Sequence, residues 1–382
     1  MPAATELPAA AVRRLLTAML RFPEGVVTSG VREVDLTLRL ARRARLLGRL
    51  AERLQRGGLI AGLPAAAREQ LESALVVVDA RARAARWEVD RLYRALNSEH
   101  SMRVVVLKGS AYLLAGLPNA AGRVFADVDL LFAEAELPQA ERLLLVHGWR
   151  GTKLSPYDQH YYRAWTHELP PLVHVEREVE ADLHHNIVPR AGRLKPPAER
   201  LLASAKPISG TQLYRLADHD LVLHAMTHLM FDSEMADALR DLVDIDDLSR
   251  HFATANPNFW DALWERAQEL DLARPAFYAL RYSYMLLDTP VPGTVLHRSR
   301  KGAPPRAVVW IMDRLVPRAL YPQHPESHGR AAAAARFLLY VRSLWIRMPP
   351  LLLVRHLAYK FYLRRLRREP RAATAGGEPR AA

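Results

Sequence analysis

Cysteine is absent from this 382-residue chain. Disulfide cross-links, thiolate zinc sites and cysteine nucleophiles are therefore excluded. The first residues, M-P-A-A-T-E-L-P, include an early glutamate and lack the basic segment and apolar stretch of a secretory signal. The best candidate for a membrane span, around Met348 to Leu353, is short and flanked by arginines. We therefore expect a cytoplasmic protein.

Length and composition indicate a folded protein with several regions. Hydrophobic residues make up 50% of the chain and charged residues 25%, as in globular proteins. We predict an N-terminal helical region over 1–101, a core of strands and helices over 102–215, a helical domain over 216–290, and a basic helical region with a disordered tail over 291–382. The expected fold class is α+β, with a small mixed β-sheet flanked by helices.

The formal net charge of +13 is concentrated near the C-terminus. From Gly293 onward there are 18 Lys and Arg against 4 Asp and Glu. Arg330 to Arg368 has the pattern of a basic amphipathic helix interrupted at Pro349 and Pro350. The favoured interpretation is a packed helix with an arginine-rich solvated exterior. Peripheral contact with a membrane surface comes second, and nucleic acid third, because no recognised binding motif accompanies the charge.

Helical patterns precede and follow the predicted core. Leucines recur at helical spacing from Val31 to Leu54, and a second helical run extends from Ala66 to Leu96. The arginines of this N-terminal part are expected on a solvated face. The chain is predicted to be helical again from Asp218, and the prolines and glycines between Pro290 and Pro305 indicate a linker.

Acidic residues occur at strand spacing in two predicted strands. In V-F-A-D-V-D-L-L-F, a period of two places Asp127 and Asp129 on one face of the strand. In V-E-A-D-L-H-H, the same period places Glu180, Asp182 and His184 together. Upstream, V-V-V-L-K-G-S is a short β-branched run that ends in a glycine-serine turn before a brief predicted helix.

These three segments together match the needs of nucleotidyl transfer. Such chemistry neutralises phosphate charge with divalent cations, which carboxylates on adjacent strands can hold. Magnesium prefers oxygen ligands. A glycine-serine turn that opens a helix offers backbone N–H groups to a phosphate. A lone D-x-D pattern, by contrast, is often only the solvated face of an edge strand.

The combined motifs resemble the DNA polymerase β superfamily of nucleotidyltransferases. More narrowly, V-V-L-K-G-S-A-Y-L-L-A-G-L-P, R-V-F-A-D-V-D-L-L-F, V-E-A-D-L-H-H-N-I and the downstream L-H-A-M-T-H and R-D-L-V-D-I-D-D-L resemble a bacterial family of uncharacterised nucleotidyltransferases. The likeness covers roughly residues 36–252. It implies a nucleotidyltransferase core at 102–215 that moves an NMP group from an NTP to an unknown hydroxyl or phosphate acceptor.

The resemblance also implies roles for individual residues. Asp127 and Asp129 would hold two Mg²⁺ or Mn²⁺ ions, and Asp182 would complete the metal site and help to deprotonate the acceptor. Glu178 and Glu180 compete with Asp182 for this role.

The nucleotide would be bound by four further residues near these acids. The resemblance implies phosphate contacts from the backbone N–H groups and hydroxyl of Gly109 and Ser110. Lys108 and Arg123 would balance phosphate charge. The alternative functions are a catalytically inactive relative that binds a nucleotide or a partner, and a D-x-D glycosyltransferase that uses a nucleotide sugar.

The histidines have a metal-site interpretation and a simpler one. His224 and His228 are four residues apart on a predicted helix, a spacing that suits a zinc pair, and His184 and His185 could add imidazoles. No H-E-x-x-H pattern is present, so we favour hydrogen-bonded core histidines.

A charged cluster follows on the next predicted helix, at Arg240, Asp241 and Asp244. Its spacing most simply predicts ion pairs within that helix, with contact to the nucleotide as the alternative.

Overall fold

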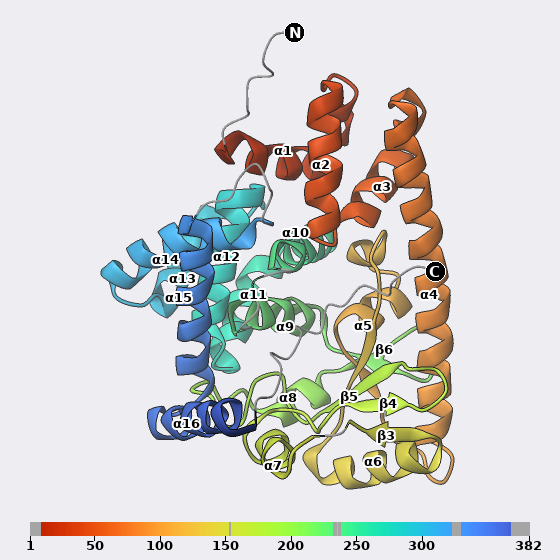
Figure 1. Cartoon of the computed structure of the whole chain (residues 1–382), viewed down its shortest axis with the longest axis vertical. Helices are drawn as coiled ribbons and strands as arrows, with labels where there is room; N and C mark the ends of the chain where they lie inside the picture. The colour runs from red at the N-terminus through yellow and green to blue at the C-terminus, as the bar shows by residue number, and fades with distance from the viewer. Residues whose placement is uncertain (1–8, 153, 232–234, 236–237, 323–329, 368–382) are drawn as a thin grey trace.

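A mixed β-sheet surrounded by helices forms the molecule, so the predicted α+β class is confirmed (Figure 1). The computed structural model describes residues 9–152, 154–231, 235, 238–322 and 330–367. The tail predicted to be disordered, residues 370–382, lies outside these residues.

The sheet has seven strands in the order β3-β4-β5-β2-β1-β7-β6. Their bounds are β1 Val105–Val106, β2 Asp127–Leu131, β3 Trp149–Gly151, β4 Leu172–His174, β5 Glu180–His184, β6 Lys206–Pro207 and β7 Tyr214–Arg215. Strand β2 pairs in parallel with β5 and antiparallel with β1, and β1 pairs in parallel with β7. The strand predicted to carry two aspartates is therefore central, with a neighbour on each side, and is not a solvated edge.

Short helices connect the strands. They are α5 Lys108–Leu114, α6 Leu137–Val146, α7 Pro156–Trp165 and α8 Ala198–Ala203, with single 3₁₀ turns at Pro118–Ala120 and Glu134–Glu136. Helix α5 begins one residue after β1 and packs against β2, which confirms the predicted order of strand and brief helix. The helix begins at Lys108, earlier than predicted, so Gly109 and Ser110 lie in its first turn. The Ser155 hydroxyl caps α7 by accepting a hydrogen bond from the backbone N–H of Asp158 at 3.1 Å.

The N-terminal helices are α1 Ala9–Arg21, α2 Val31–Arg43, α3 Leu47–Arg56 and α4 Ala65–Leu96, with 3₁₀ turns at Pro23–Val26 and Ile60–Gly62. The predicted run from Val31 to Leu54 is divided at Arg45, whose φ of 54° ends the first helix. Helix α4 packs against α3, α5 and α6 and runs along one side of the molecule (Figure 1). It joins the N-terminal helices to the sheet.

One N-terminal arginine lies in the interior, contrary to the prediction that these arginines are solvated. The Arg49 side chain is 3% exposed. It pairs with Asp244 at 2.7 Å and with Asp247 at 3.0 Å, both on α10. A buried guanidinium needs such partners because desolvation of an unpaired charge costs several kcal/mol. Leucine periodicity finds the buried face of a helix but gives no sign of an arginine with distant carboxylate partners.

A second group of helices follows the sheet in the chain and packs together: α9 Asp218–Phe231, α10 Ala238–Ala255, α11 Phe259–Glu269, α12 Ala273–Leu287, α13 Gly293–Ser299 and α14 Arg306–Leu320. The linker predicted between Pro290 and Pro305 is wrong, because α13 and the 3₁₀ turn Arg300–Gly302 occupy it. Val295 is buried against this helical layer. Pro292 and Pro305 stand at the N-caps of α13 and α14, where a missing N–H costs nothing.

The last two described helices are α15 Arg330–Arg347 and α16 Pro350–Arg367, which confirms the predicted break at the proline pair. Within the described residues, no single helix has the length and hydropathy for a membrane span. Arg330–Arg347 and Pro350–Tyr359 meet that test together, with a bend of 118° between them. Contrary to the favoured interpretation, Phe337 and Trp345 are exposed on α15 while Arg342 packs inward.

Candidate active site

The register of β2 and β5 places the predicted acids side by side. Asp129 pairs with Asp182, and Asp127 pairs with Glu180. The next alternate position pairs Leu131 with His184. One ligand atom from each of Asp129, Asp182 and His184 lies within 4.8 Å of the others. The structure thus brings Asp129 together with Asp182, the acid that the sequence could not separate from Glu178 and Glu180.

Asp129 is the most enclosed of these carboxylates, with 3% of the residue exposed. The Lys108 ammonium donates to its Oδ1 at 2.6 Å, and His184 Nε2 lies 2.9 Å from the same oxygen. Burial alone would raise the pKa of Asp129, but the Lys108 charge and the His184 hydrogen bond hold it well below its usual value. Asp129 is therefore ionised at neutral pH.

Lys108 reaches Asp129 from an unusual backbone position. Its φ of 44° lies in the left-handed region, which a residue with a side chain adopts at a cost of about 1 kcal/mol. Burial would lower the pKa of Lys108, but the adjacent Asp129 carboxylate raises it above its usual value. The sequence predicted Lys108 as a phosphate partner, and in the structure its ammonium is held by a carboxylate.

Asp182 has the opposite electrostatic environment. Burial, followed by the charges of Asp129, Glu168 and Glu180, raises the pKa of Asp182 to about 9. Its Oδ1 is buried and has no hydrogen-bond partner within the described part of the chain. The carboxyl group therefore carries a proton at neutral pH unless a cation replaces it. A buried oxygen of this kind suits a cation ligand.

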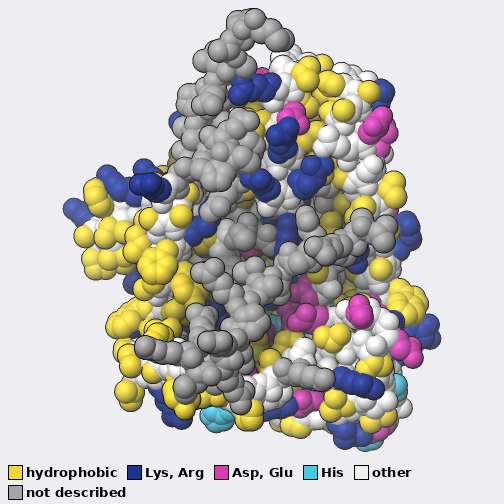
Figure 2. Space-filling view, in the orientation of Figure 1, with side chains coloured by type: hydrophobic (Ala, Val, Ile, Leu, Met, Phe, Trp, Pro, Cys, Tyr) yellow, Lys and Arg dark blue, Asp and Glu magenta, His cyan; other side chains and the backbone are white. Residues whose placement is uncertain are grey.

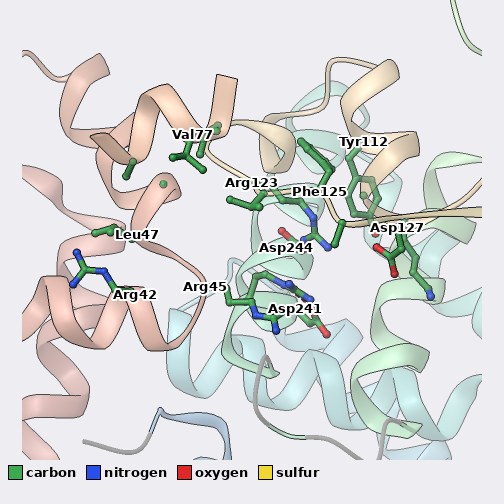
Figure 3. A pocket seen from close by; sticks show the side chains of 18 of the residues that line it. Arg42, Arg45, Leu47, Val77, Tyr112, Arg123, Phe125, Asp127, Asp241 and Asp244 are labelled. Carbon is green, nitrogen blue, oxygen red and sulfur yellow. Dashed lines mark hydrogen bonds and ion pairs between the residues drawn. The ribbon is translucent and has the colours of Figure 1, made fainter. Parts of the chain in front are cut away.

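A cavity of about 710 Å³ opens beside Asp127 and Asp129, which both line it. Its walls come from α2 to α5, the start of β2, and helices α9 and α10. Figure 3 shows Arg42 on one side of this cavity and Asp127 on the other, with Arg45, Arg123, Asp241 and Asp244 between them. The volume is within the range of small-molecule sites. Cationic and acidic groups thus face a common space.

The predicted nucleotide-binding residues surround this cavity. Lys108, Gly109 and Arg123 line it, while Ser110 is buried with its hydroxyl 3.5 Å from the Asp127 carbonyl oxygen. A Cβ atom on Gly109 would lie 3.2 Å from the Arg123 Nε and from a Phe125 ring carbon, so a side chain there would be crowded.

The charged cluster on α10 faces this cavity. Arg123 pairs with Asp244, which Arg49 also contacts. Asp241 contacts Arg240 of α10 and His228 of α9. The predicted intrahelical pairing therefore holds for Arg240 and Asp241 and is wrong for Asp244, whose partners lie far away in sequence.

The histidines and Glu168 near the site are arranged differently from what the sequence indicated. In the described residues, two groups can hold a metal ion, and His184 belongs to both. His224, His228 and His185 belong to neither, so the alternative of a zinc site at the helical histidine pair gains no support. Glu168 carried no signal in its local pattern, and it is placed by an isolated antiparallel bridge to His184.

Comparison with known families agrees with this geometry. The model of a family described as uncharacterised nucleotidyltransferase matches residues 31–288. The chain belongs to this family. The match includes the glycine-serine turn, both acidic strands and the helices that line the cavity. No curated protein and no solved structure matches the chain.

The protonated state of Asp182 predicts a pH-dependent stability change. Because the folded-state pKa is about 9 and that of the unfolded chain is about 4, the unfolded state is increasingly favoured as pH rises through this window. Asp182→Asn cannot lose a proton. In metal-free protein we expect this variant to melt several degrees above wild type at pH 7, as a gain of a few kcal/mol in the free energy of unfolding would produce.

Melting curves of both proteins at a series of pH values measure this difference. The difference in melting temperature between Asp182→Asn and wild type should vanish near pH 4 and grow toward pH 9. The matched control is Asp79→Asn at an exposed position of α4, which should change little. An Asp182→Asn variant that is no more stable than wild type at pH 7 would contradict the elevated pKa.

Proposed function

We propose that this protein is a metal-dependent nucleotidyltransferase that moves an NMP group from an NTP to a hydroxyl or phosphate acceptor. Membership of a nucleotidyltransferase family supports the transfer reaction and the NTP substrate. The observation that carries the proposal for the site is the in-register pairing of Asp129 with Asp182 beside a cavity that Asp127 also lines. Asp127 and Asp129 line this ligand-sized space, and Asp182 lies next to Asp129 on the neighbouring strand.

The carboxylates fit a divalent cation such as Mg²⁺ or Mn²⁺. Ligand atoms of Asp129 and Asp182 are within 4.8 Å of each other, and the Asp182 Oδ1 has no hydrogen-bond partner among the described residues. Asp127, Asp129 and Asp182 would hold the metal. When bound, divalent ions neutralise phosphate charge and align the attacking and leaving oxygens. Metal binding would also offset the repulsion that keeps Asp182 protonated.

The protein's own groups would position the reactants. Arg42, on the side opposite Asp127, and Arg45, near the middle, present positive charge to the cavity, where phosphate oxygens of an NTP would be attracted. In the transfer, the acceptor oxygen bonds to the α-phosphorus, and the bond from this phosphorus to the bridging oxygen breaks. Pyrophosphate leaves, and the acceptor proton passes to the Asp182 carboxylate.

The second candidate is an inactive relative that binds a nucleotide without transferring it. Lys108 and Arg123, which the sequence assigns to phosphate, already pair with Asp129 and Asp244. This arrangement would stabilise the site without a metal or a substrate. Family membership weighs against the glycosyltransferase alternative.

Transfer of label from α-labelled NTPs tests the proposal. The full chain is incubated with each NTP and Mg²⁺ or Mn²⁺, in the presence of protein, RNA and small hydroxyl acceptors, and pyrophosphate release is followed in parallel. We expect metal-dependent release that falls at least about a hundredfold in Asp127→Asn, Asp129→Asn and Asp182→Asn, because each substitution removes a metal ligand.

The matched control is Glu180→Gln, an acid on the same face of β5 that pairs with Asp127. It should keep most of the activity. Loss of activity in Glu180→Gln with retention in Asp182→Asn would assign the third carboxylate to Glu180. Equal rates for wild type and Asp129→Asn would end the catalytic claim. Metal-dependent NTP binding without any release would favour the inactive relative.

A further inference from the structure

Beside the proposed catalytic carboxylates lies a second group of potential ligands: His167, Glu168 and His184. The nearest ring nitrogen of His184, Nδ1, is 3.5 Å from Glu168 Oε2, and His167 Nε2 is 3.8 Å from the same oxygen. One ligand atom from each of the three lies within 4.8 Å of the others. We propose that these residues bind a first-row transition-metal ion of the Zn²⁺ type.

The spacing of the three side chains suits a shared ion. Two ligands about 2.1 Å from a tetrahedral metal lie about 3.4 Å apart, which is close to both distances from Glu168 Oε2. His184 is 1% exposed, and its Nδ1 has no hydrogen-bond partner within the described residues. A buried imidazole nitrogen that faces a carboxylate without a hydrogen bond costs free energy. A bound metal ion would give this nitrogen a partner.

The backbone holds these ligands in place. Glu168 and His184 form an antiparallel bridge, and the backbone N–H of His185 donates to the His167 carbonyl oxygen at 2.9 Å. The N–H of Leu169 donates to the Leu183 carbonyl oxygen at 2.8 Å on the other side of the bridge. Ligands fixed by a strand-like ladder do not need to be ordered by the metal, which favours binding.

The donor set separates this site from the carboxylate site. Two imidazoles and one carboxylate favour Zn²⁺ and neighbouring transition metals over Mg²⁺, which prefers oxygen. The two sites would share the His184 ring through its two nitrogens. Nε2 is hydrogen-bonded to Asp129, and Nδ1 faces Glu168. A metal on Nδ1 fixes the ring proton on Nε2, so this N–H donates to Asp129. The outer site would thereby orient a carboxylate of the inner one.

Metal binding by the full-length protein tests the assignment. The protein is stripped with a chelator and dialysed against Zn²⁺ in the presence of excess Mg²⁺. We expect about one Zn²⁺ to be retained per chain and visible absorption bands when Co²⁺ replaces it. His167→Gln and Glu168→Gln should each weaken Zn²⁺ binding about tenfold or more, because each removes a ligand.

Two controls separate this site from surface histidines and from the proposed function. His160→Gln removes an exposed imidazole of α7 and should leave Zn²⁺ binding unchanged. Asp127→Asn should also retain Zn²⁺ while it abolishes transfer. Wild-type protein that gives no visible Co²⁺ bands, or that releases Zn²⁺ to an equal concentration of Mg²⁺, would overturn the proposal even if the ligand variants do not fold.

An independent observation concerns the outer surface of α15. The helix is fixed to the body through arginines: Arg342 donates to the Met230 carbonyl oxygen at 3.0 Å, and Arg336 donates to the Tyr321 carbonyl oxygen at 2.6 Å. Ala335 and Leu339 are buried against the body, but Phe337, Leu338 and Val341 point away, and Phe337 is 64% exposed. An ordinary surface helix packs its one apolar face inward, whereas α15 carries a second apolar face on the outside.

Helix α16 extends the same surface. Tyr359 stacks on Tyr157 of α7 with ring centroids 4.0 Å apart, which fixes the inner side of the helix. Leu351, at 84% exposed, and Val354 remain on the outside. Figure 2 shows hydrophobic side chains gathered with basic ones on the flank of the molecule formed by α14 to α16. An apolar surface of this extent indicates a partner.

Charge identifies the partner. Helices α15 and α16 contain nine Lys and Arg and no Asp or Glu. We infer that the outer face of α15 and α16, centred on Phe337, Leu338, Val341, Trp345, Leu351 and Val354, docks on an anionic lipid bilayer. Aromatic and aliphatic residues would enter the headgroup boundary, and exposed basic side chains such as Arg330 and Arg355 would meet lipid phosphates.

Flotation of the full chain with lipid vesicles tests this docking. We expect binding to vesicles that contain an anionic phospholipid, weak binding to neutral phosphatidylcholine vesicles, and a loss of binding at high salt. The triple variant Phe337→Ser/Trp345→Ser/Leu351→Ser should reduce binding about tenfold or more, because apolar insertion is lost. Val76→Ser, at an exposed apolar position of α4, is the control.

Other partners would give different results. A concentration-dependent dimer that the triple variant abolishes, without vesicle binding by the wild type, would assign this face to a second copy of the chain. If the protein binds nucleic acid in competition with vesicles, and the triple variant binds it equally well, then the basic charge alone accounts for binding. Either result would overturn the bilayer proposal.

Discussion

The parallel pairing of β2 with β5 is the constraint on which the site depends. It sets Asp129 next to Asp182 at the distance between neighbouring strands, about 4.8 Å. Two buried carboxylates at this spacing cannot both ionise without a cation. Lys108 and His184 satisfy Asp129, so Asp182 keeps its proton. The sheet thus places a protonated carboxyl group beside an ionised carboxylate, an arrangement that suits a cation.

The cavity beside these acids is built from segments that are far apart in sequence. Helix α3 contributes Leu47 and Gly48, and the loop before β2 contributes Arg123. Arg123 and the buried Arg49 of α3 both pair with Asp244 of α10. A substitution of Asp244 would remove a carboxylate partner from two largely desolvated guanidinium groups, which is more costly than the loss of one surface ion pair. The N-terminal helices are therefore part of the site, although the sequence motifs lie in the sheet.

Strand periodicity was sufficient to predict that Asp127 and Asp129 share a face of β2 and that Asp182 shares a face of β5 with Glu180, since a period of two fixes the face of each side chain. The structure brings Asp129 together with Asp182, while Asp127 belongs to neither group of possible metal ligands in the described residues. Periodicity could not show which strands pair, so Glu180 remained an alternative to Asp182 until the register was known. His184 was noted only as an additional imidazole, because its two nitrogens acquire different partners through long-range contacts.

The predicted linker between Pro290 and Pro305 was wrong because proline has more than one structural role. The prolines near residue 290 indicated a linker, but proline also begins helices, as it does for α13 and α14.

Diffraction from crystals grown with Mn²⁺ and a non-hydrolysable NTP analogue tests the central claim most directly, because the anomalous signal locates the ion without reference to activity. The account predicts a Mn²⁺ peak within coordination distance of Asp127, Asp129 and Asp182, with the triphosphate in the adjacent cavity. A metal peak away from these carboxylates, or an NTP analogue bound elsewhere on the protein, would contradict it.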